Sequence, residues 1–501
     1  MTALSDDRHH HTIPKESSTP ALPLHMRGCT ATAASGVLPD TPERACRVVT
    51  LPTEAAFDAD AVQDLLRAGL NVAVIDTRFD SPTHWRAMAE QVRRASAALR
   101  QPVTVWLQLQ GQSVHTVDLG QGPSGLKLKP TKDDFGRVYA PARLGLYALG
   151  GSGVMQRVDA SVAVWSDWLQ RLKKGDEIDF IDARGAKRHL MIEQIAPWGA
   201  VAQCPRTAYL NTQTVLRIGH SSKKKHSTLV CQLEHRSPGV RLHMGDLLRL
   251  TPHPTAASTD LDPPESLDVD WVRMGCSDAQ LLAHLQPGQT LWLGGASLEA
   301  TTQQVDATGT LLHITRAAHR GSQLDANTPI FWRHDHVAPS APAAQELGWV
   351  RALRDQIDAV VSGPVHTADD LTTWSQALHT VNAPALVAQL ASPQAAHALI
   401  NGTLTSAAGV QAWWMKPDLL GLGLPWHTLA QAHAQWWRQL GELPVIESRQ
   451  SVQSMVQSPI WGRLELAALR NTEAVRGWHV PRGAHQLDAL SALSEALGGA
   501  V

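Results

Sequence analysis

Apolar strands that alternate with amphipathic helices constrain the fold of this chain more than any other sequence feature. In the first part of the chain, short apolar runs predict strands at residues 47–51, 71–76 and 102–111. Between them, residues 58–70 and 81–100 repeat apolar side chains at helical spacing, and Ser81 followed by Pro82 is typical of a helix start. Successive strand and helix units of this kind predict a parallel sheet covered by helices.

The alternation stops after Gly111 and returns only beyond residue 335. Residues 113–335 contain short alternating strands separated by Gly, Pro and Asp turns, and the segments LKKGDEIDFID and LHMGDLLRLTP both place a Gly-Asp turn before a strand. Further buried strands are expected within 357–365, 384–392, 409–421 and 443–451. We therefore predict an α/β fold, a TIM (β/α)8 barrel with an inserted β-rich, β-barrel-like domain after the third strand.

The predicted barrel occupies residues 46–112 and 336–485, on either side of the inserted domain. Residues 1–45 are polar and interrupted by prolines, which predicts a disordered N-terminal arm. Residues 486–501 are expected to form a C-terminal tail or helix. In such barrels the functional side chains lie on the loops that follow the C-terminal ends of the strands, so candidate site residues are expected there.

The overall charge gives little reason to expect nucleic acid or a membrane as a partner. The formal net charge is −2, and no apolar run reaches the roughly 18 residues of a spanning helix. The lysines within His220–Ser227 are interpreted as an exposed hairpin tip. Because the N-terminus lacks the apolar core of a secretory signal, the cytoplasm is the expected location. The five cysteines are scattered without a CxxC pair, so we expect them to be reduced and mostly buried.

The order of the strand ends resembles that of the pyruvate kinases, in particular a bacterial form without the C-terminal regulatory domain. The resemblance rests on the segments LLRAGLNVAVIDTRFD, VTVWLQLQGQSVHT, IDAVVSGPVHTADDL, PALVAQLAS, WMKPDLLG, LPVIESRQ and GRLELAALRNTEAV. It implies a barrel enzyme that transfers a phosphoryl group between phosphoenolpyruvate and ADP with Mg2+ and K+. That reaction depends on charged groups that position the phosphate and neutralise its charge.

Most of the charged residues that this resemblance implies are replaced. Val74 stands where the family has a substrate-binding Arg, and its following Asn, Ser and His correspond to Asp76, Arg78 and Phe79. Gln389 and Ala391 replace the catalytic Lys and one metal-binding Glu, while Asp418 retains the second metal carboxylate. Further replaced positions are Gln108, Gln112, Ser113, His115 and Arg449. Loss of one transition-state contact lowers a rate about 100- to 1000-fold, so their joint loss predicts a non-catalytic homologue.

The remaining polar residues predict a small-anion site at the barrel mouth. Lys416, Arg449 and Arg78 follow different strands and could attract a phosphorylated or carboxylate metabolite. Candidate hydrogen-bond donors to it are Ser362, Thr116 and Gln450. Asp418 is interpreted either as a weak Mg2+ ligand or as a helix cap. Two alternatives stay open: the protein is a scaffold without a ligand, or it is an active or altered pyruvate kinase that uses Mg2+ and K+.

Histidine and tryptophan motifs supply the remaining candidates. His334 and His336 form an HxH motif around Asp335, and His9–His11 form a triplet, so both are candidate metal ligands. The tryptophan pairs in QAWWMK and AQWWRQL are interpreted mainly as core, with an exposed tryptophan surface for a protein partner as the alternative. Because no phosphate-loop or dinucleotide motif occurs, no replacement nucleotide site is expected.

Overall fold

The structure is a computed structural model. It describes residues 37–39, 45–117, 125–133, 135–151, 158–219, 226–233, 240–252, 272–333, 340–404, 409–458, 469 and 475–498. Nearly all of the predicted N-terminal arm, the candidate ligands His9–His11, His334 and His336, and most of the His220–Ser227 cluster lie outside the described residues. None of the helices among the described residues combines the length and the apolar character needed to span a bilayer.

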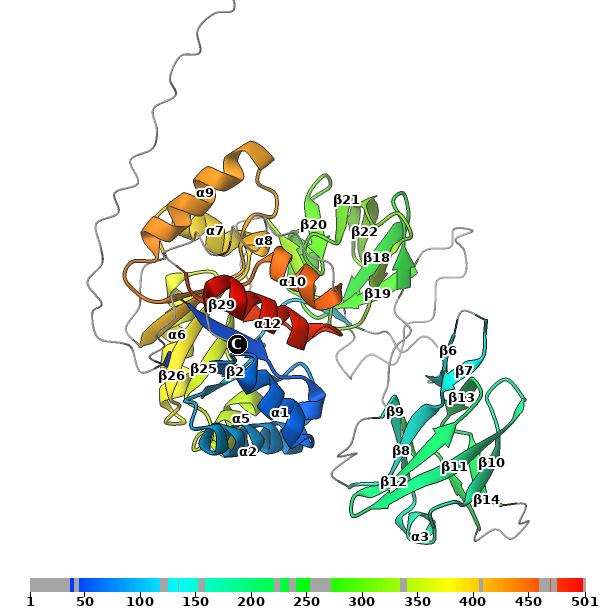
Figure 1. The fold of residues 1–501 in the computed structure, drawn as a ribbon. Coiled ribbons are helices and arrows are strands. Elements are labelled where there is room, and N and C mark those ends of the chain that lie inside the picture. The colour runs from blue at the N-terminus through cyan, green and yellow to red at the C-terminus, as the bar shows by residue number, and fades with distance from the viewer. Residues whose placement is uncertain are drawn as a thin grey trace, which may run out of the picture. The chain divides into compact units, whose positions relative to one another are not determined.

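Eight parallel strands close into a barrel, which confirms the predicted TIM barrel (Figure 1). The strands, in barrel order, are β1 (Cys46–Thr50), β2 (Val72–Asp76), β3 (Thr104–Gln108), β25 (Ala359–Pro364), β26 (Ala385–Leu390), β27 (Val410–Met415), β28 (Val445–Glu447) and β29 (Val475–Val480). The chain leaves the barrel after β3 and re-enters it at β25, so the insertion follows the third strand as predicted.

Helices line the outside of the barrel. They are α1 (Ala59–Arg67), α2 (Pro82–Leu99), α5 (Ala344–Leu353), α6 (Ala368–His379), α7 (Pro393–Ile400), α8 (Pro417–Leu420), α9 (Trp426–Gln439), α10 (Gln450–Gln457) and α12 (Gln486–Leu497), with a 3-10 helix at Thr53–Ala56. Ser81 is the N-cap residue of α2, as expected, but its hydroxyl bonds to the ring of His84 at 2.7 Å and makes no cap bond to the helix backbone.

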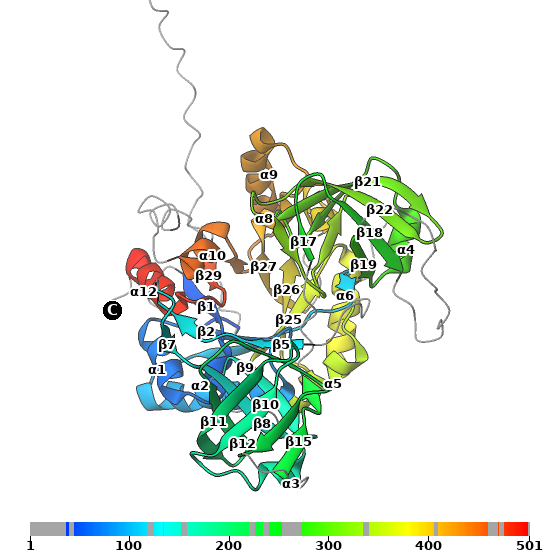
Figure 2. The same ribbon diagram turned by 90° about the vertical axis from the view of Figure 1, so that its right-hand side faces the viewer.

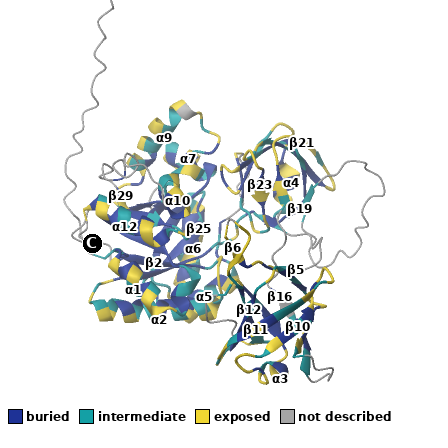
Figure 3. Ribbon diagram, turned by 45° about the vertical axis from the view of Figure 1, so that its right-hand side comes forward, coloured by how far each residue is buried: buried dark blue, intermediate teal, exposed yellow. Residues whose placement is uncertain are grey.

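The barrel has two apolar cores, one inside the ring of strands and one between the strands and the helices, and tryptophans contribute to both. Inside the barrel, Val48, Val74, Trp106 and Trp414 form a buried apolar cluster, while Trp413 faces outward into the layer between strands and helices. Trp413 and Trp414 point to opposite faces of the strand, because side chains alternate along it, and both are buried. This pair therefore offers no exposed tryptophan surface for a protein partner. Figure 3 shows the buried strands beneath the more exposed helices.

The inserted domain consists of two β modules that share one strand order (Figure 2). In the first module the order β14-β10-β11-β12-β8-β9 comprises β14 (Val215–Ile218), β10 (Glu177–Ile181), β11 (Lys187–Ala196), β12 (Gly199–Cys204), β8 (Ala142–Ala148) and β9 (Ala160–Val164). In the second module the order β24-β20-β21-β22-β18-β19 comprises β24 (Ile330–Trp332), β20 (Thr290–Leu293), β21 (Leu298–Asp306), β22 (Gly309–Arg316), β18 (Leu247–Pro252) and β19 (Val272–Cys276).

The correspondence between the modules extends to details of strand pairing. Both pair their last two strands, β8 with β9 and β18 with β19, in parallel and the others antiparallel. Both have a register shift in the long hairpin, between Ile192 and Gln194 and between Thr302 and Gln304. Each module has its own apolar core. The insertion is therefore one β fold present twice.

A smaller ribbon accompanies each module, and a short helix follows its parallel strand. The ribbons are β5 (Gly125–Leu128) with β13 (Ala208–Asn211), and β17 (Val240–Leu242) with β23 (Ser322–Leu324); the helices are α3 (Ser166–Leu169) and α4 (Ala279–His284). The Gly-Asp turns of the two similar sequence segments, at Gly175 and Gly245, precede β10 and β18. These two strands do not occupy corresponding places in the two modules.

The remaining short strands lie at the edges of these sheets. They are β4 (Thr116–Val117), β6 (Thr131–Lys132), β7 (Val138–Ala140), β15 (Ser227–Leu229) and β16 (Gln232–Leu233). Cys46, Cys204 and Cys276 are buried free thiols and Cys231 is a half-buried one, while Cys29 lies outside the described residues. These four thiols match the expectation that the cysteines are reduced and mostly buried.

Candidate functional site

Polar side chains replace the apolar core at the C-terminal ends of the barrel strands. On β2, Val74 is fully buried in the barrel interior, and Asp76 lies two residues further on the same face. Gln108 on β3 and Gln389 on β26 occupy equivalent buried positions. The strand ends thus form a polar layer above an apolar one, because inward-facing residues alternate along each strand.

Asp76 and Arg78 form an ion pair at the centre of this layer. The Arg78 guanidinium donates Nε and Nη2 to Oδ2 of Asp76 at 3.0 and 2.6 Å, and its backbone N–H donates to Oδ1 at 3.0 Å. Gln110 Nε2 donates to the same Oδ1 at 3.1 Å. Asp76 is 1% exposed, so Arg78 compensates a buried carboxylate. Arg78, predicted to bind an anion, is therefore already committed to a partner.

Lys416 faces this ion pair and has no partner of its own. It follows β27 as the N-cap residue of α8, and its ammonium group makes no hydrogen bond or ion pair in the part of the chain that the structure describes. Burial and, to a smaller extent, the positive charge of Arg78 lower the pKa of Lys416 to about 8, against the opposing effect of Asp76. A half-buried ammonium group without a partner is an unsatisfied donor of three hydrogen bonds.

His479 completes the cluster from β29. Its Nε2 lies 2.8 Å from Oγ1 of Thr50 and its Nδ1 lies 2.9 Å from Oγ of Ser448, which accepts the indole N–H of Trp414 at 2.8 Å. Burial, followed by the charges of Lys416 and Arg78, lowers the pKa of His479 well below its usual value. The imidazole is therefore neutral at physiological pH. We name Asp76, Arg78, Lys416 and His479 the mouth cluster.

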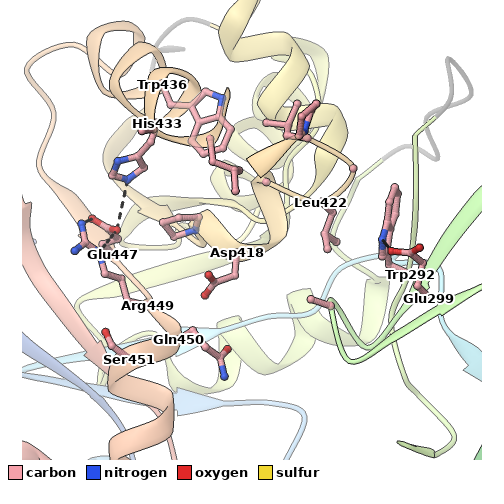
Figure 4. A pocket seen from close by; sticks show the side chains of 18 of the residues that line it. Trp292, Glu299, Asp418, Leu422, His433, Trp436, Glu447, Arg449, Gln450 and Ser451 are labelled. Atoms are coloured by element: carbon pink, nitrogen blue, oxygen red, sulfur yellow. Dashed lines mark hydrogen bonds and ion pairs between the residues drawn. The ribbon is translucent and has the colours of Figure 1, made fainter. Parts of the chain in front are cut away.

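A pocket of about 740 Å³ lies beside the mouth cluster (Figure 4). Its barrel side is formed by α8, α9 and the start of α10, and its other side by Trp292, Glu299 and Arg316 of the second β module. This module packs on the barrel there, because Trp292 and Phe331 form an apolar cluster with Leu422. Two side chains also donate hydrogen bonds across the junction, Gln394 Nε2 to the Trp332 carbonyl at 2.7 Å and Arg333 Nη1 to the Gly423 carbonyl at 3.0 Å.

Glu447 and Arg449 form an ion pair in the pocket wall. Arg449 Nε lies 2.6 Å from Oε1 of Glu447, which is fully buried, and the guanidinium carbon lies 4.9 Å from the centre of the Trp478 ring. His433 Nε2 lies 3.6 Å from the same oxygen (Figure 4). Arg449 was predicted to bind an anion together with Lys416 and Arg78. The structure instead places it on Glu447, outside the mouth cluster.

Asp418 lies in the first turn of α8 and lines the pocket. It is not the cap of that helix, since Lys416 holds the N-cap position. Asp418 lies near the backbone N–H of Gln450, the first residue of α10. Burial raises the pKa of Asp418, and the nearby charge of Glu447 raises it further, although the Gln450 N–H and Arg449 oppose this.

These carboxylates are poorly suited to Mg2+. Mg2+ in proteins is held by one or two carboxylates together with water and substrate oxygens. Asp418 has the negative charge of Glu447 as a neighbour, but Arg449 already neutralises Glu447. Ala391, where the resemblance to pyruvate kinases implies a metal-binding Glu, is a buried residue with only a methyl side chain. Among the described residues no three His, Cys, Asp or Glu side chains gather closely enough to hold a metal ion.

Two of the predicted hydrogen-bond donors are used elsewhere. Ser362 is fully buried, and its hydroxyl donates to the Gly363 carbonyl at 2.7 Å while accepting the Gln389 N–H at 3.0 Å. Thr116 lies on β4, where its hydroxyl donates to the Asp325 carbonyl of the second β module at 2.7 Å. Neither hydroxyl is available to a ligand at the mouth. Gln450 is exposed and lines the pocket.

Three other replaced positions have structural roles or surroundings of their own. Phe79 is 41% exposed and lies between the guanidinium groups of Arg78 and Arg482, at 5.4 and 4.5 Å from its ring centre. The backbone carbonyl oxygen of Ser113 lies 2.7 Å from Nδ1 of His115 and accepts a hydrogen bond from it when the imidazole carries its proton on Nδ1. Gln389 is 3% exposed, and its Nε2 has no hydrogen-bond partner.

Sequence reasoning missed Glu447 and His479. Both have a sequence signal, because Glu447 ends the apolar run LPVIE and His479 is the penultimate residue of the strand that ends in WHV, where a barrel strand presents functional groups. The pairing of Asp76 with Arg78 was also missed. The two residues were considered separately, as replacements of two family residues, although they lie close enough along the chain to bond.

Comparisons with known proteins identify the fold. No protein-family model matches the sequence, and no curated protein does. The pyruvate kinase from Pyrobaculum aerophilum superposes with a TM-score of 0.54 over 91% of this chain and 74% of its own, at 12% identity. The Cryptosporidium parvum pyruvate kinase in complex with ADP gives the same score and identity over 92% and 68%. The chain therefore has a pyruvate kinase-like fold.

Proposed function

We propose that this chain, whose fold is that of the pyruvate kinases, is a non-catalytic protein that binds a small phosphate- or carboxylate-bearing metabolite at the barrel mouth. The observation that carries the proposal is the ammonium group of Lys416, which has no hydrogen-bond or ion-pair partner among the described residues. Lys416 is also the only lysine in residues 46–112 and 336–485. An anion would stabilise the charged ammonium group of a lysine in this position, because an ionic hydrogen bond would replace the hydrogen bonds to water that burial removes.

The surroundings of Lys416 favour a small anion with one or two negative charges. Arg78 adds positive charge, but Asp76 cancels most of it and repels large polyanions at close range. Neutral His479 bonds to two hydroxyl groups and adds no charge. A single phosphate or carboxylate group therefore matches the net charge of the mouth cluster better than a nucleoside triphosphate does.

The charged side chains that phosphoryl transfer needs are absent from the positions where the fold would place them. Gln389 and Ala391 are neutral, and Val74 lies in the apolar barrel core. Since catalysis of this reaction is mainly positioning and charge stabilisation, neutral residues at these positions support loss of turnover. The other candidate is an altered pyruvate kinase, favoured only by the closeness of the Asp418 and Glu447 carboxylates. We expect no Mg2+ binding there, because Arg449 occupies Glu447.

Thermal unfolding in the presence of anions tests the binding proposal. Inorganic phosphate, oxalate, pyruvate and phosphoenolpyruvate should each be titrated against the full chain at constant ionic strength. We expect at least one to raise the unfolding temperature, as a ligand that binds only the folded state must. The rise should disappear in Lys416→Met and persist in Lys416→Arg. No shift with any of these anions, or an equal shift in Lys416→Met, would refute the proposed site.

A coupled assay with phosphoenolpyruvate, ADP, Mg2+ and K+ tests the loss of catalysis separately. We expect no turnover above that of buffer. Turnover that is abolished by Asp418→Asn, in a protein that still unfolds cooperatively, would establish the altered kinase instead. The two experiments are independent, because a working enzyme and a binding protein both respond to anions but only the enzyme consumes them.

A further inference from the structure

Lysine and tyrosine are concentrated in the first of the two β modules. Residues 125–233 contain nine of the eleven lysines and all three tyrosines of the chain. They carry 17 Lys and Arg against nine Asp and Glu, whereas the rest of the chain carries 27 against 37. The near-neutral total, from which no nucleic-acid partner was expected, therefore conceals a basic module within an acidic protein. The second module, with the same strand order, contains no lysine.

The β5–β13 ribbon of the first module carries cations beside an aromatic ring. Lys127 on β5 lies opposite Tyr209 on β13, with its ammonium nitrogen 5.7 Å from the centre of the Tyr209 ring. The Arg184 guanidinium lies 3.8 Å from the same ring. Lys127 and Lys129 are exposed on the outer face, because the intervening Leu128 points into the module core. The corresponding β17–β23 ribbon pairs Arg241 with Gln323 and has no aromatic ring there.

A hairpin that the second module lacks follows β5 directly in sequence. Strands β6 and β7 lie between β5 and β8, whereas β17 and β18 are joined by residues 243–246 alone. The hairpin exposes 86% of Phe135 and 82% of Tyr139, next to the exposed cation Lys132. Exposure of two large aromatic side chains on one short hairpin is costly unless they contact a partner. None of Lys127, Lys129 and Lys132 forms an ion pair with another described residue.

We propose that this surface binds single-stranded nucleic acid. We name the side chains of Lys127, Lys129, Lys132, Phe135, Tyr139 and Tyr209 the basic ribbon. Its lysines can neutralise phosphate groups, and its exposed aromatic rings offer faces on which unpaired bases stack. Stacking needs bases that are free of a duplex, so the aromatic residues favour a single strand.

A membrane surface fits the hairpin less well. Lysines and aromatic residues also attract anionic lipid, but the side chain of Asp133 lies in the turn next to Phe135, where it accepts the backbone N–H groups of Phe135 and Arg137 at 3.0 and 2.8 Å. Insertion of Phe135 would carry this carboxylate toward the anionic headgroups. A single strand can contact Phe135 and the lysines without burying Asp133.

Fluorescence anisotropy with the full chain tests the proposal. The probes are labelled oligouridylate and oligothymidylate of about 12 nucleotides, a duplex of the same length and anionic phospholipid vesicles. We expect single strands to bind with micromolar affinity at about 50 mM salt, more tightly than the duplex does. Substitution of Lys127, Lys129 and Lys132 together by Ala should weaken binding about 10- to 100-fold and reduce the slope of log K against log salt by about 2. The corresponding Arg substitutions should retain binding.

Two further variants separate stacking from charge. Phe135→Ala with Tyr139→Ala should weaken binding about tenfold or more without changing the salt dependence. The matched control is Lys173→Ala with Lys174→Ala, two exposed lysines of the same module that follow α3, at its other end from β6 and β7 (Figure 1). Equal loss in this control would refute the basic ribbon as the site. Absence of single-strand binding at about 50 mM salt, or tighter binding to vesicles than to either oligonucleotide, would overturn the proposal.

Discussion

The guanidinium of Arg78 lies 2.6 Å from Oδ2 of Asp76 and neutralises a carboxylate buried at the mouth of the barrel. Two substitutions that were considered as separate losses of a kinase site thus form one interaction. Within the mouth cluster, this ion pair leaves Lys416 as the cation without a hydrogen-bond or ion-pair partner among the described residues. The opposite charges of Asp76 and Arg78 balance each other at the mouth, and single substitutions can shift this balance.

Asp76→Asn should strengthen anion binding at Lys416. Removal of this negative charge frees Arg78 and increases the positive potential at the mouth, so we expect the affinity for phosphate or oxalate to rise about three- to tenfold. The substitution should also lower the free energy of unfolding by about 1 to 3 kcal/mol, because Arg78 and Gln110 lose a charged acceptor. Isothermal titration calorimetry and urea denaturation measure the two effects. Weaker anion binding in Asp76→Asn would contradict the role given to Lys416.

Anion binding should fall as the pH rises through about 8, the value to which burial and Arg78 lower the pKa of Lys416. Above this pH the folded protein holds a neutral amine, which attracts no anion. The temperature shift caused by anions should therefore decline between about pH 7 and pH 9.5 in the unchanged protein. It should persist in Lys416→Arg, whose guanidinium stays charged.

The same pKa predicts the opposite trend for the ligand-free protein. Because the folded pKa of Lys416 is lower than its ordinary value of 10.5, the unfolded chain binds more protons between these two pH values. The contribution of Lys416 to stability should therefore rise with pH from about 8 to about 10.5. Comparison with Lys416→Met by urea denaturation at several pH values isolates this contribution. A constant difference between the two proteins would show that the pKa of Lys416 is not lowered.

Arg449→Met should destabilise the fold and leave anion binding intact. The substitution leaves Glu447 buried without its partner, which should lower the free energy of unfolding by about 2 to 4 kcal/mol. Glu447→Gln with Arg449→Met should recover part of this loss, since the buried charge is then removed. Urea denaturation measures both variants. If phosphate stabilises the parent but not Arg449→Met at a temperature where both are folded, Arg449 contacts the anion after all.

A glycine at the same hairpin position should be essential in both β modules. A Cβ atom at Gly199 would lie 2.0 Å from the Leu146 carbonyl oxygen, and one at Gly309 would lie 2.1 Å from that of Leu250. Both backbones have φ values, +153° and +135°, that favour glycine. We expect Gly199→Ala and Gly309→Ala each to expose only its own module to limited proteolysis. Gly185→Ala is the matched control, because its turn has a positive φ but no atom within 4 Å of the added Cβ.

The sequence by itself determined the barrel, the place of the insertion and the resemblance to pyruvate kinases. These follow from local patterns, since the period of apolar residues sets which segments form strands or helices and the strand ends keep the family order. That Val74, Gln389 and Ala391 are buried could also be inferred from the sequence, because their positions in apolar strand segments fix which way their side chains face.

Only the tertiary structure decided which charges pair and how the β strands assemble. Arg449 was grouped with Lys416 and Arg78, but its side chain turns toward Glu447, an interaction that depends on rotamers and packing rather than on chain order. The two similar Gly-Asp turns precede strands that do not correspond in the two modules, because strand pairing joins residues far apart in sequence and is not set by a local turn motif. Hydrophobic periodicity is a local property of the chain, whereas ion pairs and strand partners are chosen among all the groups that folding brings together.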